Sequence, residues 1–219
     1  MLALKFMHIL CWVYWLGGDL GTFYSSRFVA NASLAPAARA IAAKIMMGTD
    51  IAPRLCMPLT LVTGLHLASI SGTVAISDPL LWAIWLACAA WLWVIWSIHH
   101  GKGSSKLALI VQLDFGLRVV LLVGLGATAC AGLFGAIPGL APWLAFKLLC
   151  FAGTVACGLA IRIQLRPFGP AFARLMAQGP DAAGDQAIQR SIARCIPYVV
   201  SIWIMLLLSA ATGLHWLNP

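Results

Sequence analysis

Residues 80–98 read LLWAIWLACAAWLWVIWSI, an apolar run without a single charged residue. An α-helix rises about 1.5 Å per residue, so a run of about 20 apolar residues crosses the roughly 30 Å hydrocarbon core of a bilayer. Similar runs recur along the 219-residue chain, in which 62% of the residues are hydrophobic and 9% are charged. Soluble domains carry about 25% charged residues. The sequence therefore predicts an integral membrane protein.

Apolar length, Gly and Pro residues and the placement of charges predict an all-α, polytopic bundle of about six transmembrane helices. We expect one transmembrane domain over residues 1–219, without a soluble domain of any size. The expected helices cover residues 4–24, 51–70, 80–98, 115–137, 143–163 and 196–216. Between them, residues 36–47 are typical of a short surface helix, and residues 181–194 predict a helical run into the last span.

The basic residues indicate the topology. Of the 14 Lys and Arg residues, all but Lys5 and Lys147 lie in or beside the connections between the first and second, third and fourth, and fifth and sixth spans. By the positive-inside rule that side is cytoplasmic, which places both termini on the outer, periplasmic side of a bacterial inner membrane. The net charge of +8 is thus a topology signal. Without a basic domain or interleaved aromatic platform, membrane lipid and not nucleic acid is the expected partner.

The composition argues against a di-iron carboxylate centre and against covalently attached haem. All six acidic residues are Asp, so the Glu ligands of a di-iron carboxylate bundle are missing. The seven cysteines mostly fall inside apolar spans, and none forms a CxxC or CxxCH motif. Neither a disulfide framework nor covalent haem attachment is therefore expected, and the cysteines are interpreted mostly as small packing residues.

Two histidines come to similar depth. His8 and His66 each lie a few residues inside the outer end of their expected helix, or roughly 6 to 9 Å below the outer boundary. Sequential helices are usually neighbours, so the two imidazoles are expected to face each other. They are candidate axial ligands of one haem iron, and Lys147, at similar depth, is a candidate partner of haem propionates or another anion.

A simpler interpretation stays open for each histidine, since a His near a helix end can simply hydrogen-bond a neighbouring Ser, Thr or carbonyl group. His99 and His100, at the end of the third span, are weaker metal candidates and are expected to cap the helix at the surface. His215, near the outer end of the sixth span, is a weaker candidate for the outer cluster.

Buried charges predict ion pairs. Asp19 in the first span and Arg54 in the second fall at similar depth, and we expect a structural ion pair that fixes helix register. Asp114 and Arg118 lie one turn apart and are also expected to pair. The tryptophans at 82, 85, 93 and 96 form a stripe that either lines a porphyrin or quinone site or packs against lipid.

The first span carries a family resemblance. Residues 5–9 read KFMHI, Trp15 and Gly18 follow, and residues 23–29 read FYSSRFV. This pattern resembles the opening helix of HemJ-type protoporphyrinogen oxidases and the related CopD-like membrane proteins. The resemblance implies a haem b ligated by the first-helix histidine, here His8. HemJ-type proteins also use a Lys on a later helix, and residues 80–98 contain none. Residues 147–149 and 162–166 are closer to the CopD-like group, which is associated with copper uptake.

The leading expectation is a haem b-binding membrane protein in electron transfer or porphyrin oxidation, with a bis-His haem near the outer face. Such a protein would be a haem-dependent oxidoreductase, with a quinone or another membrane redox protein as its partner and an oligomer as one available state. The alternatives are copper or small-solute transport, and a non-catalytic subunit or assembly factor of a larger membrane complex.

Overall fold

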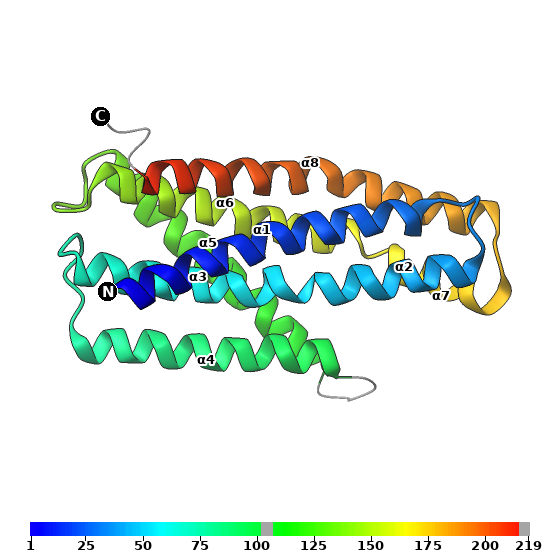
Figure 1. The fold of residues 1–219 in the computed structure, drawn as a ribbon, viewed down its shortest axis with the longest axis horizontal. Coiled ribbons are helices and arrows are strands. Elements are labelled where there is room, and N and C mark those ends of the chain that lie inside the picture. Colours follow the sequence, from blue (N-terminus) through cyan, green and yellow to red (C-terminus); the bar gives the residue numbers. More distant parts are fainter. Residues whose placement is uncertain (102–106, 215–219) are drawn as a thin grey trace.

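The computed structural model describes residues 1–101 and 107–214, which are helical apart from short connections and contain no strand. The predicted all-α class is therefore confirmed for the described part of the chain. Figure 1 shows the bundle from the side. The helices are α1 (Leu2–Ala30), α2 (Pro36–Thr49), α3 (Ile51–Ile70), α4 (Asp78–His100), α5 (Leu107–Leu133), α6 (Pro142–Gln164), α7 (Phe168–Gln178) and α8 (Ala182–Gly213).

Five helical segments are long and apolar enough to cross a membrane. They are the run of α2 and α3 together over Pro36–Ile70, then Asp78–His100, Leu107–Leu133, Pro142–Gln164 and Ala182–Gly213. The first helix, expected as a sixth span, does not reach the same hydropathy, because Lys5, His8 and Asp19 lie along it. The chain thus has the helices of an integral membrane protein.

Several helices extend beyond their predicted ends. The expected surface helix at residues 36–47 is α2, which continues into α3 after Asp50 alone. The run at residues 181–194 and the last span form one helix, α8, whose first turn is capped by Asp181 Oδ1 accepting from the Gly184 backbone N–H at 2.7 Å. The fourth expected span begins earlier, at Leu107, so Asp114 lies two turns inside α5. Hydropathy did not indicate α7, which is short and amphipathic.

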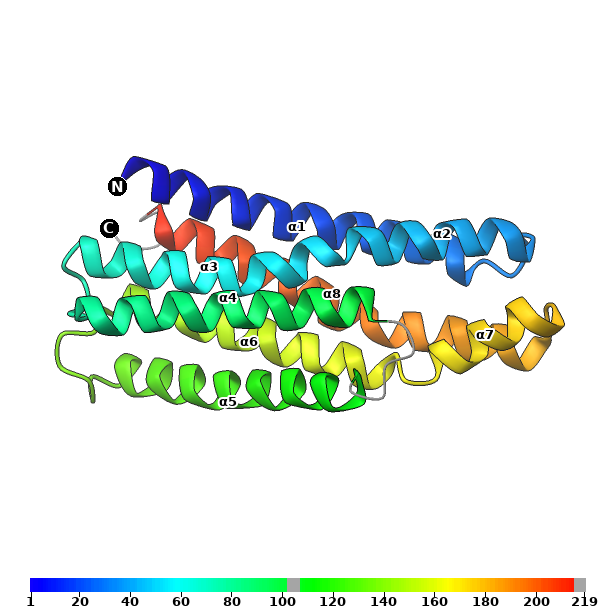
Figure 2. The same ribbon diagram turned by 90° about the horizontal axis from the view of Figure 1, so that it is seen from below.

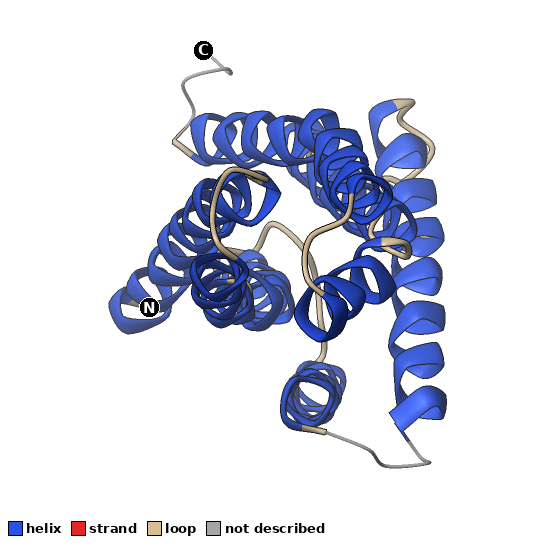
Figure 3. Cartoon of the chain, turned by 90° about the vertical axis from the view of Figure 1, so that its right-hand side faces the viewer, coloured by secondary structure: helices blue, strands red, loops and turns tan. Residues whose placement is uncertain are grey.

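The longer helices form two antiparallel sets. One consists of α1 and α3, the other of α5, α6 and α8, and α1 also contacts α8. The fourth helix packs only against α3 and α5 among the described elements, and Figure 2 shows it from below, between these two helices. It lies at the margin of the bundle in Figures 1 and 3. The start of α1 and the end of α8 lie at one end of the bundle, which we call the N-terminal end; α2 and α7 lie at the opposite, basic end (Figure 1).

Two apolar clusters hold the bundle. The larger one joins α1, α3, α4, α6 and α8. It contains Cys11, Trp15, Cys56, Met57, Trp91, Ile95, Val155, Leu159, Ile202 and Leu206. The smaller one lies at the basic end, where Val29, Ala171, Leu175 and Ile188 are buried around Arg39.

The Arg39 side chain is fully buried and connects three helices. Its Nε donates to the Val29 carbonyl at 2.9 Å, and its Nη1 donates to Asp185 Oδ1 at 2.6 Å. The guanidinium thus ties α1 and α2 to α8. A buried charge that is both paired and hydrogen-bonded costs far less than one left alone, so this contact fixes the arrangement of the basic end.

Candidate functional site

His8 lies between α1 and α3 near the N-terminal end. Its Nδ1 is 2.8 Å from Thr63 Oγ1, and the Thr63 hydroxyl donates in turn to the Leu59 carbonyl at 2.6 Å. Because that hydroxyl proton is already used, Nδ1 is the donor and Thr63 Oγ1 the acceptor. The neutral imidazole is therefore the Nδ1–H tautomer, and its lone pair is on Nε2.

The ring of His8 also packs against a glycine. A Cβ placed on Gly64 would lie 3.2 Å from His8 Cε1, so the missing side chain at Gly64 makes room for the imidazole. We call His8, Thr63, Gly64 and Lys147 the His8 cluster. The sequence argument expected His8 to face His66 on the second span, and in the structure the contacts of His8 on α3 are Thr63 and Gly64.

Lys147 belongs to the same cluster. It lies on α6 within electrostatic range of the His8 imidazole. Its Nζ also approaches α8, since a Cβ on Gly213 would lie 2.9 Å away. The ammonium group is half-buried with no acidic side chain within ion-pair distance among the described residues. A cation in this position favours an anionic ligand beside His8.

His66 faces a different neighbour. The Trp85 indole N–H donates to His66 Nδ1 at 3.2 Å, and the two rings meet edge to face with centroids 6.1 Å apart. Because Nδ1 accepts, the proton of the neutral imidazole is on Nε2. His66 lines a small cavity of about 180 Å³ with Asp78, Leu81, Trp82 and Trp85. Among the described residues no ring contact joins His8 and His66.

The remaining histidines lie apart from this cluster. His100 Nδ1 is 3.1 Å from the Trp96 carbonyl, and the His99 and His100 rings are 4.9 Å apart at the exposed end of α4. They end α4, at the end of that helix that is farther from the start of α1 (Figure 1). His215, the weaker candidate for the outer cluster, is outside the described residues.

The sulfur-containing side chains of Cys11, Cys56 and Met57 lie close together. The thiols of Cys11 and Cys56 form a side-chain hydrogen bond in the large apolar cluster, beside Met57. Cys11 on α1 and Cys56 on α3 therefore lie at the same level of the bundle. Within residues 1–101 and 107–214, no group of three or more His, Cys or Asp side chains is placed to hold a metal ion.

Arg54 has a different partner from the one expected. Its guanidinium pairs with Asp50, one turn earlier on the same helix stretch, rather than with Asp19. Asp19 accepts a hydrogen bond from the Trp15 indole, and its Oδ2 is buried with no hydrogen-bond partner among the described residues. Asp19 thus lies near the Asp50–Arg54 pair as a polar group that the fold leaves partly unsatisfied.

A second set of charged side chains lies across the bundle from Asp19, Asp50 and Arg54. Asp114 is fully buried and binds Arg118 Nε at 3.1 Å and Arg162 Nη2 at 2.6 Å, while the Trp91 indole donates to its Oδ1 at 2.8 Å. Arg118 also lies over the Trp91 ring, with 5.4 Å from Cζ to the centroid. The expected Asp114–Arg118 pair is confirmed. We call Trp91, Asp114, Arg118 and Arg162 the Asp114 network, which joins α4, α5 and α6.

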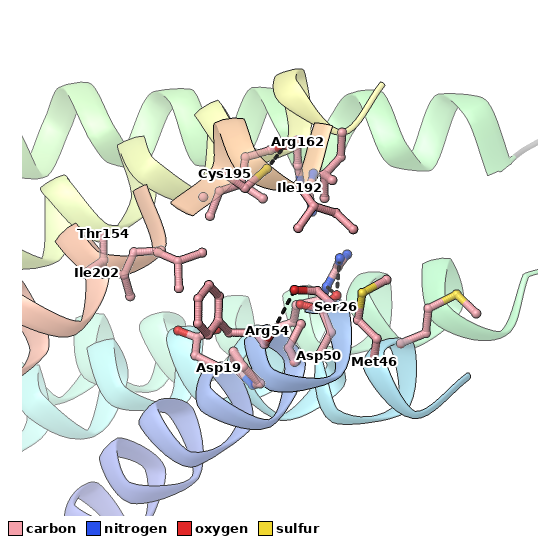
Figure 4. A pocket seen from close by; sticks show the side chains of 18 of the residues that line it. Asp19, Ser26, Met46, Asp50, Arg54, Thr154, Arg162, Ile192, Cys195 and Ile202 are labelled. Carbon is pink, nitrogen blue, oxygen red and sulfur yellow. Dashed lines mark hydrogen bonds and ion pairs between the residues drawn. The ribbon is translucent and has the colours of Figure 1, made fainter. Parts of the chain in front are cut away.

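Between these two charged groups lies a cavity of about 360 Å³. Figure 4 shows its two walls, with Asp19, Asp50 and Arg54 on one side and Arg162, Cys195 and Ile202 on the other. Most residues of each wall are spaced three or four apart on one helix face. These stripes are Trp15, Asp19, Thr22 and Ser26 on α1; Pro53, Arg54 and Met57 on α3; Thr154, Gly158, Ile161 and Arg162 on α6; and Ile192, Cys195, Val199 and Ile202 on α8.

The tryptophan stripe on α4 does not line this cavity. Trp82, Trp93 and Trp96 are exposed on the outside of the bundle, and only Trp85 turns inward to His66. This arrangement matches aromatic packing against lipid.

Sequence reasoning missed the role of Arg162, which was counted only as a basic residue of a connection. The signal was present, because Arg162 near the end of α6 and Asp114 near the start of α5 lie at the same end of two sequential, antiparallel helices. Depth matching applied to this pair would have indicated the contact.

Comparison of the chain with protein-family models, with curated proteins and with solved structures yields no match.

Proposed function

We propose that this chain is a haem b-binding protein of a bacterial inner membrane, acting in electron transfer or porphyrin oxidation. In this proposal α1 crosses the membrane with the other five segments, and both termini lie on the periplasmic side. The haem lies at the N-terminal end of the bundle, with His8 as an axial ligand and Lys147 beside the propionates.

The observation that carries the proposal is the hydrogen bond from His8 Nδ1–H to Thr63 Oγ1, at 2.8 Å. Histidines that bind a metal almost always donate their other ring N–H to a neighbouring acceptor, which fixes the tautomer and the ring orientation. The Thr63 hydroxyl is held by the Leu59 carbonyl, so the acceptor itself is positioned. Nε2 then carries the lone pair that iron requires.

Lys147 and His66, the two other predicted haem contacts, fit the proposed haem site to different degrees. Lys147 is an uncompensated cation close to His8, as a propionate partner requires. His66, proposed as the second axial ligand, offers Nε2–H while Trp85 donates to Nδ1. Ligation by His66 therefore requires the Trp85 hydrogen bond to break. Haem, when bound, would supply one-electron chemistry, and the protein would tune it through the axial histidine, the apolar walls and the nearby charge.

The test is a reduced-minus-oxidised absorption spectrum, with metal analysis, on protein purified in mild detergent after expression with ample haem supply. The wild type should show sharp b-type bands. His8→Ala should abolish them, and His99→Ala, a change at the end of α4 that is farther from the start of α1, should leave them unaltered. A colourless wild type, or full haem content in His8→Ala, would refute the proposal.

Two further variants separate the roles within the site. Thr63→Val keeps the side-chain shape but removes the acceptor for His8 Nδ1, and should weaken haem affinity by about 10- to 100-fold. Thr128→Val, on exposed α5, is the matched control. His66→Ala decides between a bis-His haem, which would be lost, and a haem held by His8 alone.

Copper handling is the second candidate, supported by the contact between the Cys11 and Cys56 thiols beside Met57. Thiolate and thioether groups are the ligands that Cu(I) prefers. In that case Cys11→Ser should lower bound copper in the same metal analysis, while His8→Ala should change no haem spectrum.

A further inference from the structure

The cavity between the two charged groups is built to hold a ligand. Its lining on α1 begins at Trp15, seven residues or roughly 10 Å of helix rise from His8, and contains no residue of the His8 cluster. Its volume of about 360 Å³ lies within the usual range for small-molecule sites, about 300 to 1,000 Å³. Four helices contribute continuous stripes to its walls.

Two buried polar atoms at the cavity have no partner among the described residues. Arg118 Nη2 is a donor on a side chain that is only 7% exposed, and Asp19 Oδ2 is an acceptor on the opposite wall. Burying such groups unpaired is unfavourable, and more so when they are charged. A ligand with one acceptor and one donor would relieve both costs.

The charge balance constrains that ligand. Two aspartates and three arginines line the cavity, and a third aspartate binds two of these arginines, so the charges of the site cancel when all six are ionised. They are Asp19, Asp50, Asp114, Arg54, Arg118 and Arg162. A net anion or cation inside a low-dielectric bundle would upset this balance. The site therefore favours a ligand without net charge.

The route of entry is apolar. Met47 and Ile196 line the cavity and are 56% and 41% exposed on the outer surface. These exposed side chains belong to α2 and α8, both part of segments apolar enough to span a membrane. A molecule dissolved in the bilayer can reach these exposed side chains more readily than a zwitterion that is dissolved in water. Trp15 and Phe23 provide ring surfaces inside.

We propose that this cavity binds the head group of a membrane quinone or quinol, which is neutral and lipid-soluble and carries two oxygens on one ring. One oxygen accepts from Arg118, and in the quinol the other oxygen donates to the Asp19 carboxylate. The inference rests on the proposed function only in the choice of a redox-active ligand. It supplies the haem protein with a redox partner and with a binding site for that partner.

The test is calorimetric titration of the protein, reconstituted in phosphatidylcholine nanodiscs, with a short-chain alkyl benzoquinone and its quinol. Gly158→Leu is the decisive variant. A Cβ at Gly158 meets nothing within 4 Å, and the residue lines the cavity, so the leucine fills the space without removing a charge. We expect saturable binding by the wild type and binding weaker by about tenfold or more in the variant.

The matched control is Gly124→Leu, an exposed position on α5 that is also free of neighbours within 4 Å and does not line the cavity. It should bind like the wild type. Asp19→Asn should weaken quinol binding by about fivefold, because the neutral amide oxygen is a weaker acceptor than the carboxylate. Equal quinone affinity in Gly158→Leu and the wild type would overturn the inference. Binding of phosphatidylglycerol in the cavity without any binding of quinone would also overturn it, because the cavity would then be a site for an anionic lipid.

The haem spectrum of the same samples keeps the two proposals distinguishable. Gly158→Leu should retain b-type bands while it loses quinone binding. Quinone binding in a colourless wild type would refute the haem proposal alone, and b-type bands without any quinone binding would refute the cavity assignment alone.

Discussion

The adjacent glycines at 17 and 18 on α1 provide a sharp test of how α1 and α3 pack. A Cβ added to Gly18 would lie 2.5 Å from Pro53 Cδ and 3.1 Å from the Ala52 Cβ. The proline ring is tied to the backbone of α3, so it cannot move aside as a flexible side chain would. A Cβ added to Gly17 meets nothing within 4 Å.

The expected magnitudes follow from these contacts. Gly→Ala in a helix interior gains up to about 1 kcal/mol from propensity alone. Overpacking a close contact costs about 1 to 3 kcal/mol, since the two helices must separate. Gly17→Ala should therefore be neutral or mildly stabilising, and Gly18→Ala should be less stable than Gly17→Ala by about 1 to 3 kcal/mol.

The assay is reversible unfolding in mixed micelles with increasing sodium dodecyl sulfate, followed by tryptophan fluorescence. The comparison of neighbouring glycines cancels the propensity term, because both substitutions add the same methyl group to the same helix. Equal stability of the two variants would refute the close approach of Gly18 to Pro53, and with it the register that brings His8 to Thr63.

Two other substitutions test the buried charges. Arg39→Met should destabilise the basic end by about 3 to 5 kcal/mol in the same unfolding assay, because Asp185 would lose its buried partner; Lys44→Met, on the exposed face of α2, should change stability little. Trp91→Phe removes the indole N–H that binds the Asp114 carboxylate and should cost about 1.5 to 3 kcal/mol. A loss below 0.5 kcal/mol, within the usual range for surface changes, would contradict the role of Arg39 or Trp91.

The sequence predicted the candidate site in part. Depth counting placed His8 opposite His66 on the second span, and Thr63 and Gly64 on that span are the residues that it contacts. The same counting did not predict that His66 turns toward Trp85 on α4. The rotation of a side chain about its helix axis depends on which neighbour packs against that face, and a residue count along one axis does not contain it.

Charge partners were predicted only where the helix itself determines them. Asp114 and Arg118 are one turn apart on the same face, and they do pair. Arg54 pairs with Asp50, also one turn away, and not with Asp19 at matched depth on another helix. Local pairs need no tertiary information, whereas a pair between helices requires both side chains to face each other.

The sequence alone determined that the chain is all-helical and built for a membrane, and where most of its spans lie, because apolar length and the absence of charge are properties of a single stretch of chain. Only the tertiary structure decided that Arg162 joins Asp114, that Asp19 has no ion-pair partner among the described residues, and that a cavity with balanced charges lies between them. Those features depend on the rotation and offset of separate helices, which are set by packing between side chains far apart in the sequence.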